Sequence, residues 1–363
     1  MKSFEVILVS TVIILGFTGC ISLLDADCVE VKSEIQSNVL FVGFEESCTI
    51  SKTGLYNVTT YSSIEKIEYD PGDTIIINGA APQTVPTRQT LETMLADKCP
   101  VIIAESTGLL YDISEEIGMA VSADNIQVYG LYYNEEKDIQ YTYFAAGFDN
   151  ELDAIEEVRA GMDPAIFGEI ENGVNGTKVC GYSFQCGDYG KISARNTYSL
   201  ESEGFGKKYY LTKYQIQGIP NADKSKSKMG LGIKLDNEGA PQTLESYGPT
   251  TSSGADHVNI TVSTSPTPIS VSWGTDIPDV SVIDNSDFGQ NIFEINYDIN
   301  ERSNSGKETL LVQPGLVASS EFEDGRYEIT EMLTAEFCKK KLFGLYYGDY
   351  QTFTCFVIIS LNI

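Results

Sequence analysis

The stretch Tyr209-Tyr-Leu-Thr-Lys-Tyr-Gln-Ile-Gln217 alternates large apolar side chains with polar ones, which is the period of a β-strand. Similar short runs continue to the end of the chain, and Gly, Ser, Thr and Pro separate them. They are residues 258–262, 269–273, 291–297, 309–312 and 352–359. Strands of this kind with turn residues between them predict a β-sandwich-like domain over residues 166–363.

Residues 36–165 have a different pattern, in which apolar strands alternate with helices. The predicted strands are 39–43, 74–78, 100–104, 125–133 and 140–146, and the predicted helices are 87–96, 109–117 and 149–159. Strands with continuous apolar runs are typical of a parallel sheet that is covered on both faces. The repeated β-α-β order therefore predicts a three-layer α/β domain with a largely parallel sheet, followed by the all-β domain.

The strand that ends at Asn78-Gly79, with the turn over residues 100–108 after it, resembles class I glutamine-amidotransferase-like and flavodoxin-like domains. In the amidotransferase enzymes this turn carries a Gly-x-Cys-x-Gly nucleophile, whereas this chain has Ser106 there. The resemblance implies a flavodoxin-like or amidotransferase-like fold and a non-catalytic member of that architecture.

Ser106 is the one catalytic candidate in the chain. Ala104-Glu-Ser-Thr-Gly108 follows a strand and precedes a helix, where a nucleophile elbow places its serine. His257, the only histidine, would have to be the base, but its neighbours indicate a surface turn. Hydroxyl residues are also common at such junctions as helix caps, so a serine hydrolase is kept only as an alternative.

The N-terminus has the features of a secretory signal. Lys2 precedes an apolar run from Val6 to Phe17, which is shorter than a membrane span. Phe17-Thr-Gly-Cys20 resembles the lipobox of prokaryotic lipoproteins, which are lipidated on the cysteine and cleaved before it. We therefore predict a signal peptide over 1–19, a lipid-attachment and linker segment over 20–35, and an extracellular location that is lipid-anchored or secreted.

Eight cysteines fit an oxidising compartment, and seven remain if Cys20 carries lipid. The local disulfide candidates are Cys180 with Cys186, Cys338 with Cys355, and Cys28 with Cys48. Cys99 then remains as a buried free thiol. Three N-x-[ST] sequons, at Asn57, Asn175 and Asn259, are glycosylation candidates in an exported protein.

The net charge of −28 argues against nucleic acid as a partner. With a single histidine, a Cys/His metal cluster is not available, and no phosphate-binding glycine loop is present in the sequence. The acidic turns at 236–239 and 284–287 offer oxygen ligands of the kind that Ca²⁺ prefers. We predict no cofactor, with a structural Ca²⁺ as the alternative.

These observations favour a non-catalytic binding or adhesion protein on the cell surface, whose ligand is an extracellular protein or a glycan. A second hypothesis is a membrane-active protein similar to pore-forming toxins, which insert hairpins of alternating apolar and hydroxyl residues. Residues 259–267 show some of this pattern, although Pro266 and Pro268 interrupt it. Membrane-crossing strands need ~9–11 residues, and the runs here are about half as long. Trp273 alternates with Ile269 and Val271, which indicates a core position.

Overall fold

A computed structural model of the protein describes most of the chain after residue 37. The described residues are 38–44, 57–81, 83–105, 107–163, 166, 175–204, 206–235, 242–250, 252, 257–264, 270–321 and 326–362. All of them belong to one unit, Ser37–Ile363.

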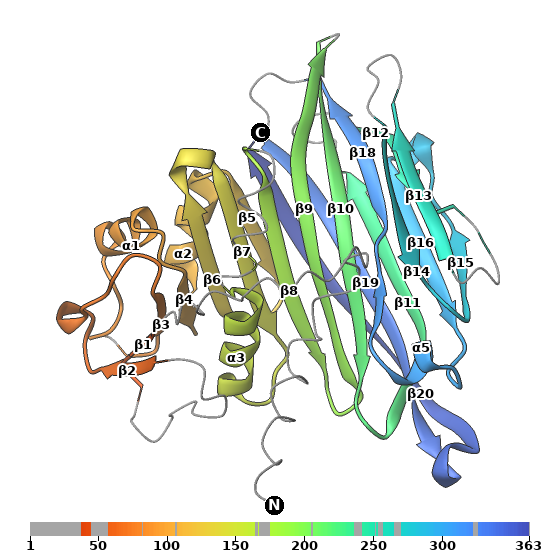
Figure 1. The fold of residues 1–363 in the computed structure, drawn as a ribbon, viewed down its shortest axis with the longest axis horizontal. Helices are drawn as coiled ribbons and strands as arrows, with labels where there is room; N and C mark the ends of the chain where they lie inside the picture. The colour runs from red at the N-terminus through yellow and green to blue at the C-terminus, as the bar shows by residue number, and fades with distance from the viewer. Residues whose placement is uncertain are drawn as a thin grey trace, which may run out of the picture. The chain divides into compact units, whose positions relative to one another are not determined.

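Strands from both halves of the chain pair in one long sheet, called sheet A (Figure 1). Its strands are β1 (Asn38–Val42), β2 (Asn57–Tyr61), β3 (Thr74–Asn78), β4 (Val101–Ala104), β6 (Ile126–Asn134), β7 (Ile139–Ala146), β8 (Lys178–Cys186), β9 (Gly190–Gly204), β10 (Lys207–Pro220), β12 (Gln242–Gly248), β17 (Leu310–Val312) and β18 (Gly315–Ser320). They lie in the order β12-β18-β10-β9-β8-β7-β6-β4-β3-β1-β2, with β17 beside β10.

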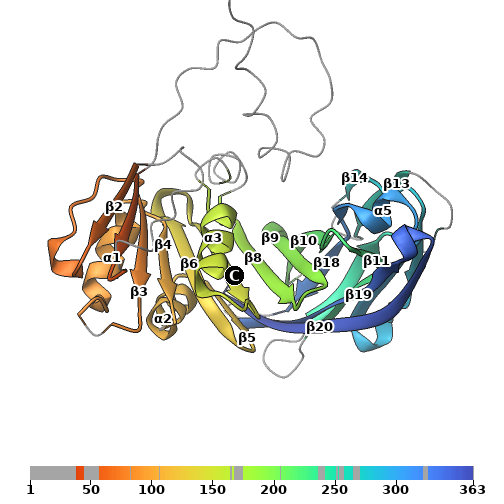
Figure 2. The same cartoon turned by 90° about the horizontal axis from the view of Figure 1, so that it is seen from below.

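A second sheet, sheet B, faces the C-terminal part of sheet A (Figure 2). Its strands are β5 (Met119–Ala123), β11 (Lys224–Leu235), β15 (Val280–Asp284), β16 (Ile292–Ile299), β19 (Arg326–Lys341) and β20 (Tyr346–Asn362). They lie in the order β15-β16-β11-β19-β20-β5. Ring contacts join the two sheets, with 5.2 Å between the centroids of Tyr210 and Tyr327 and 5.4 Å between those of Tyr247 and Phe293. The two sheets thus form a sandwich with a shared apolar layer.

Within the described residues, three helices cover the N-terminal end of sheet A. They are α1 (Arg88–Ala96), α2 (Gly108–Glu116) and α3 (Glu151–Gly161), and a short helix, α5 (Asn304–Lys307), follows later. Thr87 and Asn150 cap two of them, because Thr87 Oγ1 accepts from Thr90 N and Asn150 Oδ1 accepts from Leu152 N. The buried residues of α1 and α2 pack on one face of the sheet and those of α3 on the other (Figure 2).

The predicted three-layer α/β domain with a largely parallel sheet is wrong, and so is the flavodoxin-like or amidotransferase-like fold. β2, β1, β3 and β4 form a parallel group and β7 pairs with β8 in parallel, whereas β4–β6 and β6–β7 are antiparallel. The sheet then continues through β8 into the long antiparallel strands instead of ending. Apolar runs specify that a strand is buried, but they specify neither its direction nor where the sheet ends. The sequence predicted five strands of this half (β1, β3, β4, β6 and β7) and its three helices close to their observed bounds, but it missed β2 and β5 and gave the wrong assembly.

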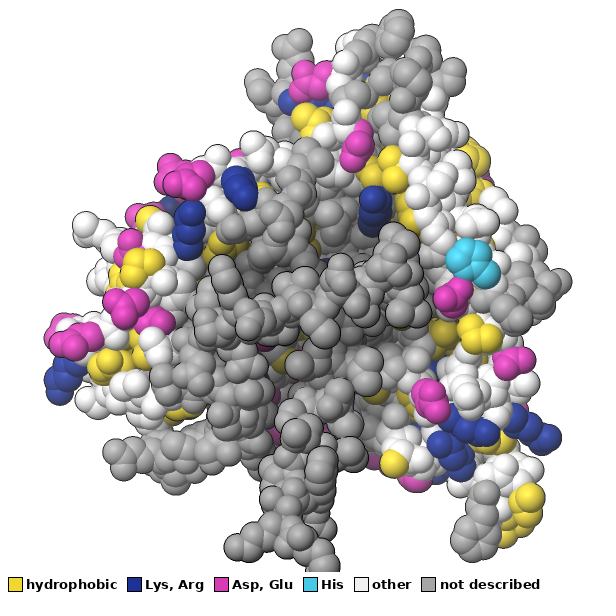
Figure 3. Space-filling view, viewed as in Figure 1, with side chains coloured by type: hydrophobic (Ala, Val, Ile, Leu, Met, Phe, Trp, Pro, Cys, Tyr) yellow, Lys and Arg dark blue, Asp and Glu magenta, His cyan; other side chains and the backbone are white. Residues whose placement is uncertain are grey.

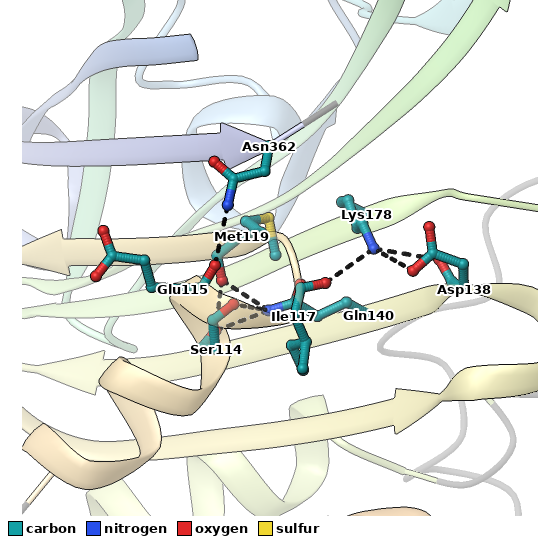
Figure 4. A network of polar contacts seen from close by, with 8 residues as sticks. All are labelled: Ser114, Glu115, Ile117, Met119, Asp138, Gln140, Lys178 and Asn362. Carbon is teal, nitrogen blue, oxygen red and sulfur yellow. Dashed lines mark hydrogen bonds and ion pairs between the residues drawn. The ribbon is translucent and has the colours of Figure 1, made fainter. Parts of the chain in front are cut away.

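The strand β5 shows why the helical segment is not a separate domain. β5 follows α2 in the chain but pairs with β20 of sheet B and not with a strand of sheet A. The C-terminal strand is therefore hydrogen-bonded to the N-terminal half. Polar contacts fix this junction (Figure 4). Asn362 donates from its backbone N to Gly118 O at 2.7 Å and from Nδ2 to Glu115 O at 3.2 Å. Gln140 Nε2 donates to Met119 O at 2.6 Å, and Lys178 Nζ donates to Asp138 Oδ1 at 2.8 Å.

A buried carboxylate lies in the layer between the two sheets. Glu331 on β19 is fully buried, and it accepts hydrogen bonds from three side chains of sheet A. The donors are Tyr182 Oη at 2.5 Å, Tyr198 Oη at 2.7 Å and Asn196 Nδ2 at 2.7 Å. Burial raises the pKa of Glu331 to about 7, although the three hydrogen bonds act in the opposite direction.

We predict that Glu331→Gln flattens the pH dependence of stability. The folded protein holds the Glu331 proton more tightly than the unfolded chain does. This stabilising contribution is therefore complete below a pH of about 4.5 and is lost as the pH rises through about 7. Relative to the variant, the wild type should lose about 3 kcal/mol of unfolding free energy between acid and weakly alkaline pH. Urea unfolding across that range measures the difference.

The matched control is Glu328→Gln, three residues earlier on the same strand and on its other face. This variant should follow the pH profile of the wild type. A wild type and a Glu331→Gln variant that run parallel at every pH would show that Glu331 does not titrate in this range.

Candidate functional site

A two-stranded hairpin lies outside both sheets. It consists of β13 (His257–Ser263) and β14 (Ser270–Asp276), which pair with each other over seven positions. Side chains on β13 alternate strictly: Val258, Ile260 and Val262 are buried, and the four residues between and around them are exposed. The outward side chains are polar, being His257, Asn259, Thr261, Ser263, Ser270, Ser272 and Asp276. The hairpin is therefore amphipathic, with its apolar face turned toward the protein.

A pair of glycines in sheet A forms the floor beneath this apolar face. Gly248 on β12 is opposite Gly315 on β18, and in the hairpin Ile260 is opposite Trp273. A Cβ placed on Gly315 would lie 2.5 Å from the Trp273 ring, and one on Gly248 would lie 2.8 Å from Ile260 Cγ2. Both distances are too short for real contacts, so the hairpin packs this closely only because the floor has no side chains.

Trp273 anchors β14 on sheet A. Its Nε1 donates to Gln313 O at 2.8 Å, and Lys213 Nζ lies 5.5 Å from the centre of its ring. On the β13 side, Ser263 N donates to Ser246 Oγ at 3.0 Å. Tyr247, between Ser246 and the floor glycine, points to the opposite face and packs on Phe293 of sheet B. The hairpin thus covers the outer face of sheet A, away from the sandwich core.

Polar side chains join the two strands at the open end of the hairpin. His257 is opposite Asp276, and its Nδ1 lies 2.6 Å from Asp276 Oδ1, while Nε2 lies 3.2 Å from Asn259 Oδ1. The hydrogen bond to Asp276 raises the pKa of His257, because it favours the charged imidazolium. This histidine was the proposed base for Ser106, and its ring is occupied by neighbours within the hairpin. Ser106 itself lies outside the described residues.

Two of the three predicted cysteine pairs fall on described residues, and there Cys99, Cys180, Cys186, Cys338 and Cys355 are free thiols. Cys180 and Cys186 are six residues apart on one strand, about 20 Å, whereas a disulfide needs Cα atoms within about 7 Å. Cys355 pairs with Leu333, five residues from Cys338. Strand geometry therefore rules out both bridges. Cys99 is the buried free thiol that the sequence predicted, and burial raises its pKa to about 11.

The remaining predicted sites are only partly described. Cys20, Cys28 and Cys48 lie outside the described residues, as does the side chain of Asn57. Asn175 and Asn259 are exposed, and glycosylation at the three asparagines stays a prediction.

Neither acidic turn forms a metal centre among the described residues. Residues 236–239 lie outside them, and in the other turn the carboxylates bind their own backbone. Asp284 Oδ1 accepts from Ser286 N at 2.9 Å, and Asp287 Oδ1 accepts from Gly289 N at 2.8 Å. No cluster of three acidic, cysteine or histidine side chains suitable for a metal occurs in the described part of the chain. A structural Ca²⁺ stays a prediction.

An open hollow of about 490 Å³ borders α3. Its lining includes four acidic residues, Asp149, Asp153, Glu156 and Glu157. Internal partners already engage two of them. Glu157 binds Lys191 and accepts from Ser183 Oγ at 2.7 Å, and Glu156 pairs with Arg159 at 2.7 Å. The hollow therefore resembles a solvated, ion-paired surface of α3 more than a prepared ligand site.

Comparisons with known proteins return structures but no relatives by sequence. No family model and no curated protein matches the chain. Similar solved structures include one described as a pore forming protein, at 10% identity and TM-score 0.33, and Clostridium perfringens delta-toxin, at 12% and 0.33. Another is the membrane-inserted form of Clostridium perfringens NetB toxin, at 9% and 0.27. Each covers 51% of this chain and 91%, 93% and 96% of its own, respectively.

Within the described residues, no helix is both long and apolar enough to cross a membrane. The feature with a distinctive geometry is the hairpin, and sequence reasoning found its alternation without finding its floor. Gly248 and Gly315 are far apart in sequence, and nothing around either glycine signals that they form one rung. The functional interpretation below therefore rests on the contacts that the hairpin makes with sheet A.

We predict that Gly315→Ala loosens the hairpin. The added methyl group would collide with the Trp273 ring, and overpacking of this kind costs about 1–3 kcal/mol. Because Trp273 is the only tryptophan, its emission should shift to longer wavelength and become easier to quench with acrylamide. The control is Gly348→Ala on β20, where a Cβ meets only the Lys341 side chain at ordinary distance. Equal spectra for the two variants would contradict the role of the glycine floor.

Proposed function

We propose that this protein acts on membranes by releasing the β13–β14 hairpin from sheet A and inserting it into a lipid bilayer. The observation that carries the proposal is the amphipathic hairpin held over the Gly248–Gly315 rung. Its apolar face is hidden in the folded protein, and the same face would meet lipid after release. The outward polar face would line an aqueous path.

The way the hairpin is attached supports its release. It belongs to neither sheet, and side-chain packing with a few hydrogen bonds holds it in place. Detaching it therefore leaves the strand pairing of sheets A and B intact. Segments that move in proteins are drawn from such weakly connected parts of the structure.

A bilayer needs slightly longer strands than the folded hairpin has. Seven residues pair in each strand, and apolar and polar residues alternate over 257–263 and 269–273, so insertion requires each strand to lengthen by a few residues. Membrane-crossing strands need ~9–11 residues. Pro266 and Pro268, which interrupt the pattern in the sequence, fall in the connection between β13 and β14, where a turn is required.

A single hairpin has unpaired backbone groups along its two outer edges, and a bilayer offers them no partner. Insertion therefore requires several copies of the chain, with hairpins side by side in a closed ring. We propose that the assembled ring forms a pore.

The predicted location belongs to the same proposal. A signal peptide over 1–19 would export the chain, and lipid on Cys20 would hold it to an outer membrane surface. Adhesion to an extracellular protein or glycan remains the alternative role for a chain in that place, without a binding surface in the structure that favours it.

We expect a disulfide between β12 and β13 to block the activity reversibly. A Cβ on Gly248 would lie 3.7 Å from Ile260 Cβ, which is within the range of a disulfide, so Gly248→Cys with Ile260→Cys would lock the hairpin onto sheet A. Oxidised, the double variant should not release dye from phosphatidylcholine vesicles, and a reducing agent should restore release to the wild-type level. Dye release is measured by fluorescence dequenching.

The two single-cysteine variants serve as controls and should leak under both redox conditions. A locked protein that leaks as fast as the wild type would overturn the proposed insertion, and so would a wild type that never causes leakage.

A further inference from the structure

The turn between β19 and β20 extends beyond the neighbouring strands (Figure 1, dark blue). These two strands are the longest in the structure, and the turn Leu342–Gly344 joins them at the end far from β5. We call residues 339–350 the tip.

Several large apolar side chains at the tip are exposed to solvent and contribute no packing to the core. The exposed fractions are 61% for Leu342, 74% for Leu345, 47% for Tyr346 and 49% for Tyr350. The backbone of Leu342 has φ +47°, in the left-handed region that suits glycine rather than leucine. A large apolar residue kept at a strained, solvent-facing position contributes neither packing nor solubility, and such strain is typical of functional sites.

Basic side chains lie directly behind the apolar turn. Lys339, Lys340 and Lys341 are consecutive, and with Asp349 as the single acid the tip has a net charge of +2 in a chain of −28. Figure 3 shows basic side chains gathered at the same corner of the molecule. The Lys339 ammonium group lies 5.2 Å from the centre of the Tyr189 ring, which holds it beside the tip. Lys224 lies near the same ring but is neutralised by Asp223 and Asp188.

We propose that the tip is a docking surface for the interface of a phospholipid bilayer. Leucine and tyrosine would enter the boundary between headgroups and acyl chains, where the apolar ring and polar hydroxyl of tyrosine are both satisfied. The lysines behind them match the charge of the lipid phosphates. The tip is a projection and not a groove, so its shape suits penetration of a soft surface. The acidic remainder of the chain would be repelled from an anionic surface, which leaves the tip as the point of contact.

This inference rests on the proposed membrane action and assigns the first contact to a different part of the molecule from the inserting hairpin. Docking and insertion can therefore fail separately. Binding to vesicles reports the first, and dye release reports the second.

Single-tryptophan variants of the full chain test the docking. In a Trp273→Phe background, Leu345→Trp places the only tryptophan at the tip, and Val85→Trp places it at another exposed apolar position. With phosphatidylcholine vesicles, with and without phosphatidylglycerol, the tip variant should shift its emission to shorter wavelength and be quenched by brominated lipid. The Val85→Trp variant should do neither. This readout is specific to position, so binding through the N-terminus would not imitate it.

The affinity of the protein for vesicles is measured separately, in variants that keep Trp273. Leu342→Ser with Leu345→Ser should weaken vesicle binding by about tenfold or more, since two exposed leucines no longer leave water. Val58→Ser with Val85→Ser is the matched control and should bind as the wild type does. Lys339→Gln with Lys340→Gln should remove the preference for phosphatidylglycerol.

The outcomes separate the two claims. If both tryptophan variants respond equally, or if neither responds, the tip does not dock on lipid, whatever the leakage result. Failure of the protein to bind protein-free vesicles would indicate a protein receptor instead. If the tip variant responds and the wild type never causes leakage, docking stands and the pore proposal fails. The oxidised lock between β12 and β13 should dock and not leak.

Discussion

Burial of the apolar layer between sheets A and B is the constraint on which the rest of the structure depends. The long strands satisfy it by placing every second side chain in that layer, where rings from the two sheets meet. A carboxylate is tolerated there only because Tyr182, Tyr198 and Asn196 each donate a hydrogen bond to Glu331. β5 extends the same layer by crossing from the helical half to pair with β20.

The outer face of sheet A, which does not face sheet B, is the face on which the hairpin packs. Where Gly248 and Gly315 lie opposite each other, the sheet has no side chains on that face, and the Ile260–Trp273 rung of the hairpin occupies the space. The apolar face of the hairpin thereby packs on the outer side of sheet A, where Val258, Ile260 and Val262 are continuous with the main buried apolar cluster. The projecting tip of β19 and β20 leaves apolar side chains uncovered at another place, with lysines beside them. Storage at one site and exposure at another are what the proposed docking and insertion require.

Several local features could be read from the sequence, because they depend on neighbours along the chain. The strands at 74–78 and 140–146, the cap at Thr87 and the amphipathic α3 each follow from nearby residue types. The alternation of β13 is visible in the sequence as well, and Pro266 and Pro268, which interrupt the pattern there, lie between the bounds of β13 and β14. The spacing of Cys180 and Cys186 suggested a bridge, because sequence spacing does not reveal the extended strand that keeps the two thiols apart.

The sequence by itself determined which segments become strands or helices and which of their faces avoid water, since periodicity is a local property. Only the tertiary structure decided that the α/β segment continues into a single sheet with the β-rich half, because strand direction and pairing depend on residues far away in the chain. It also decided that two distant glycines meet beneath Trp273. The close approach of the hairpin needs both glycines at one rung, and no stretch of sequence contains that rung.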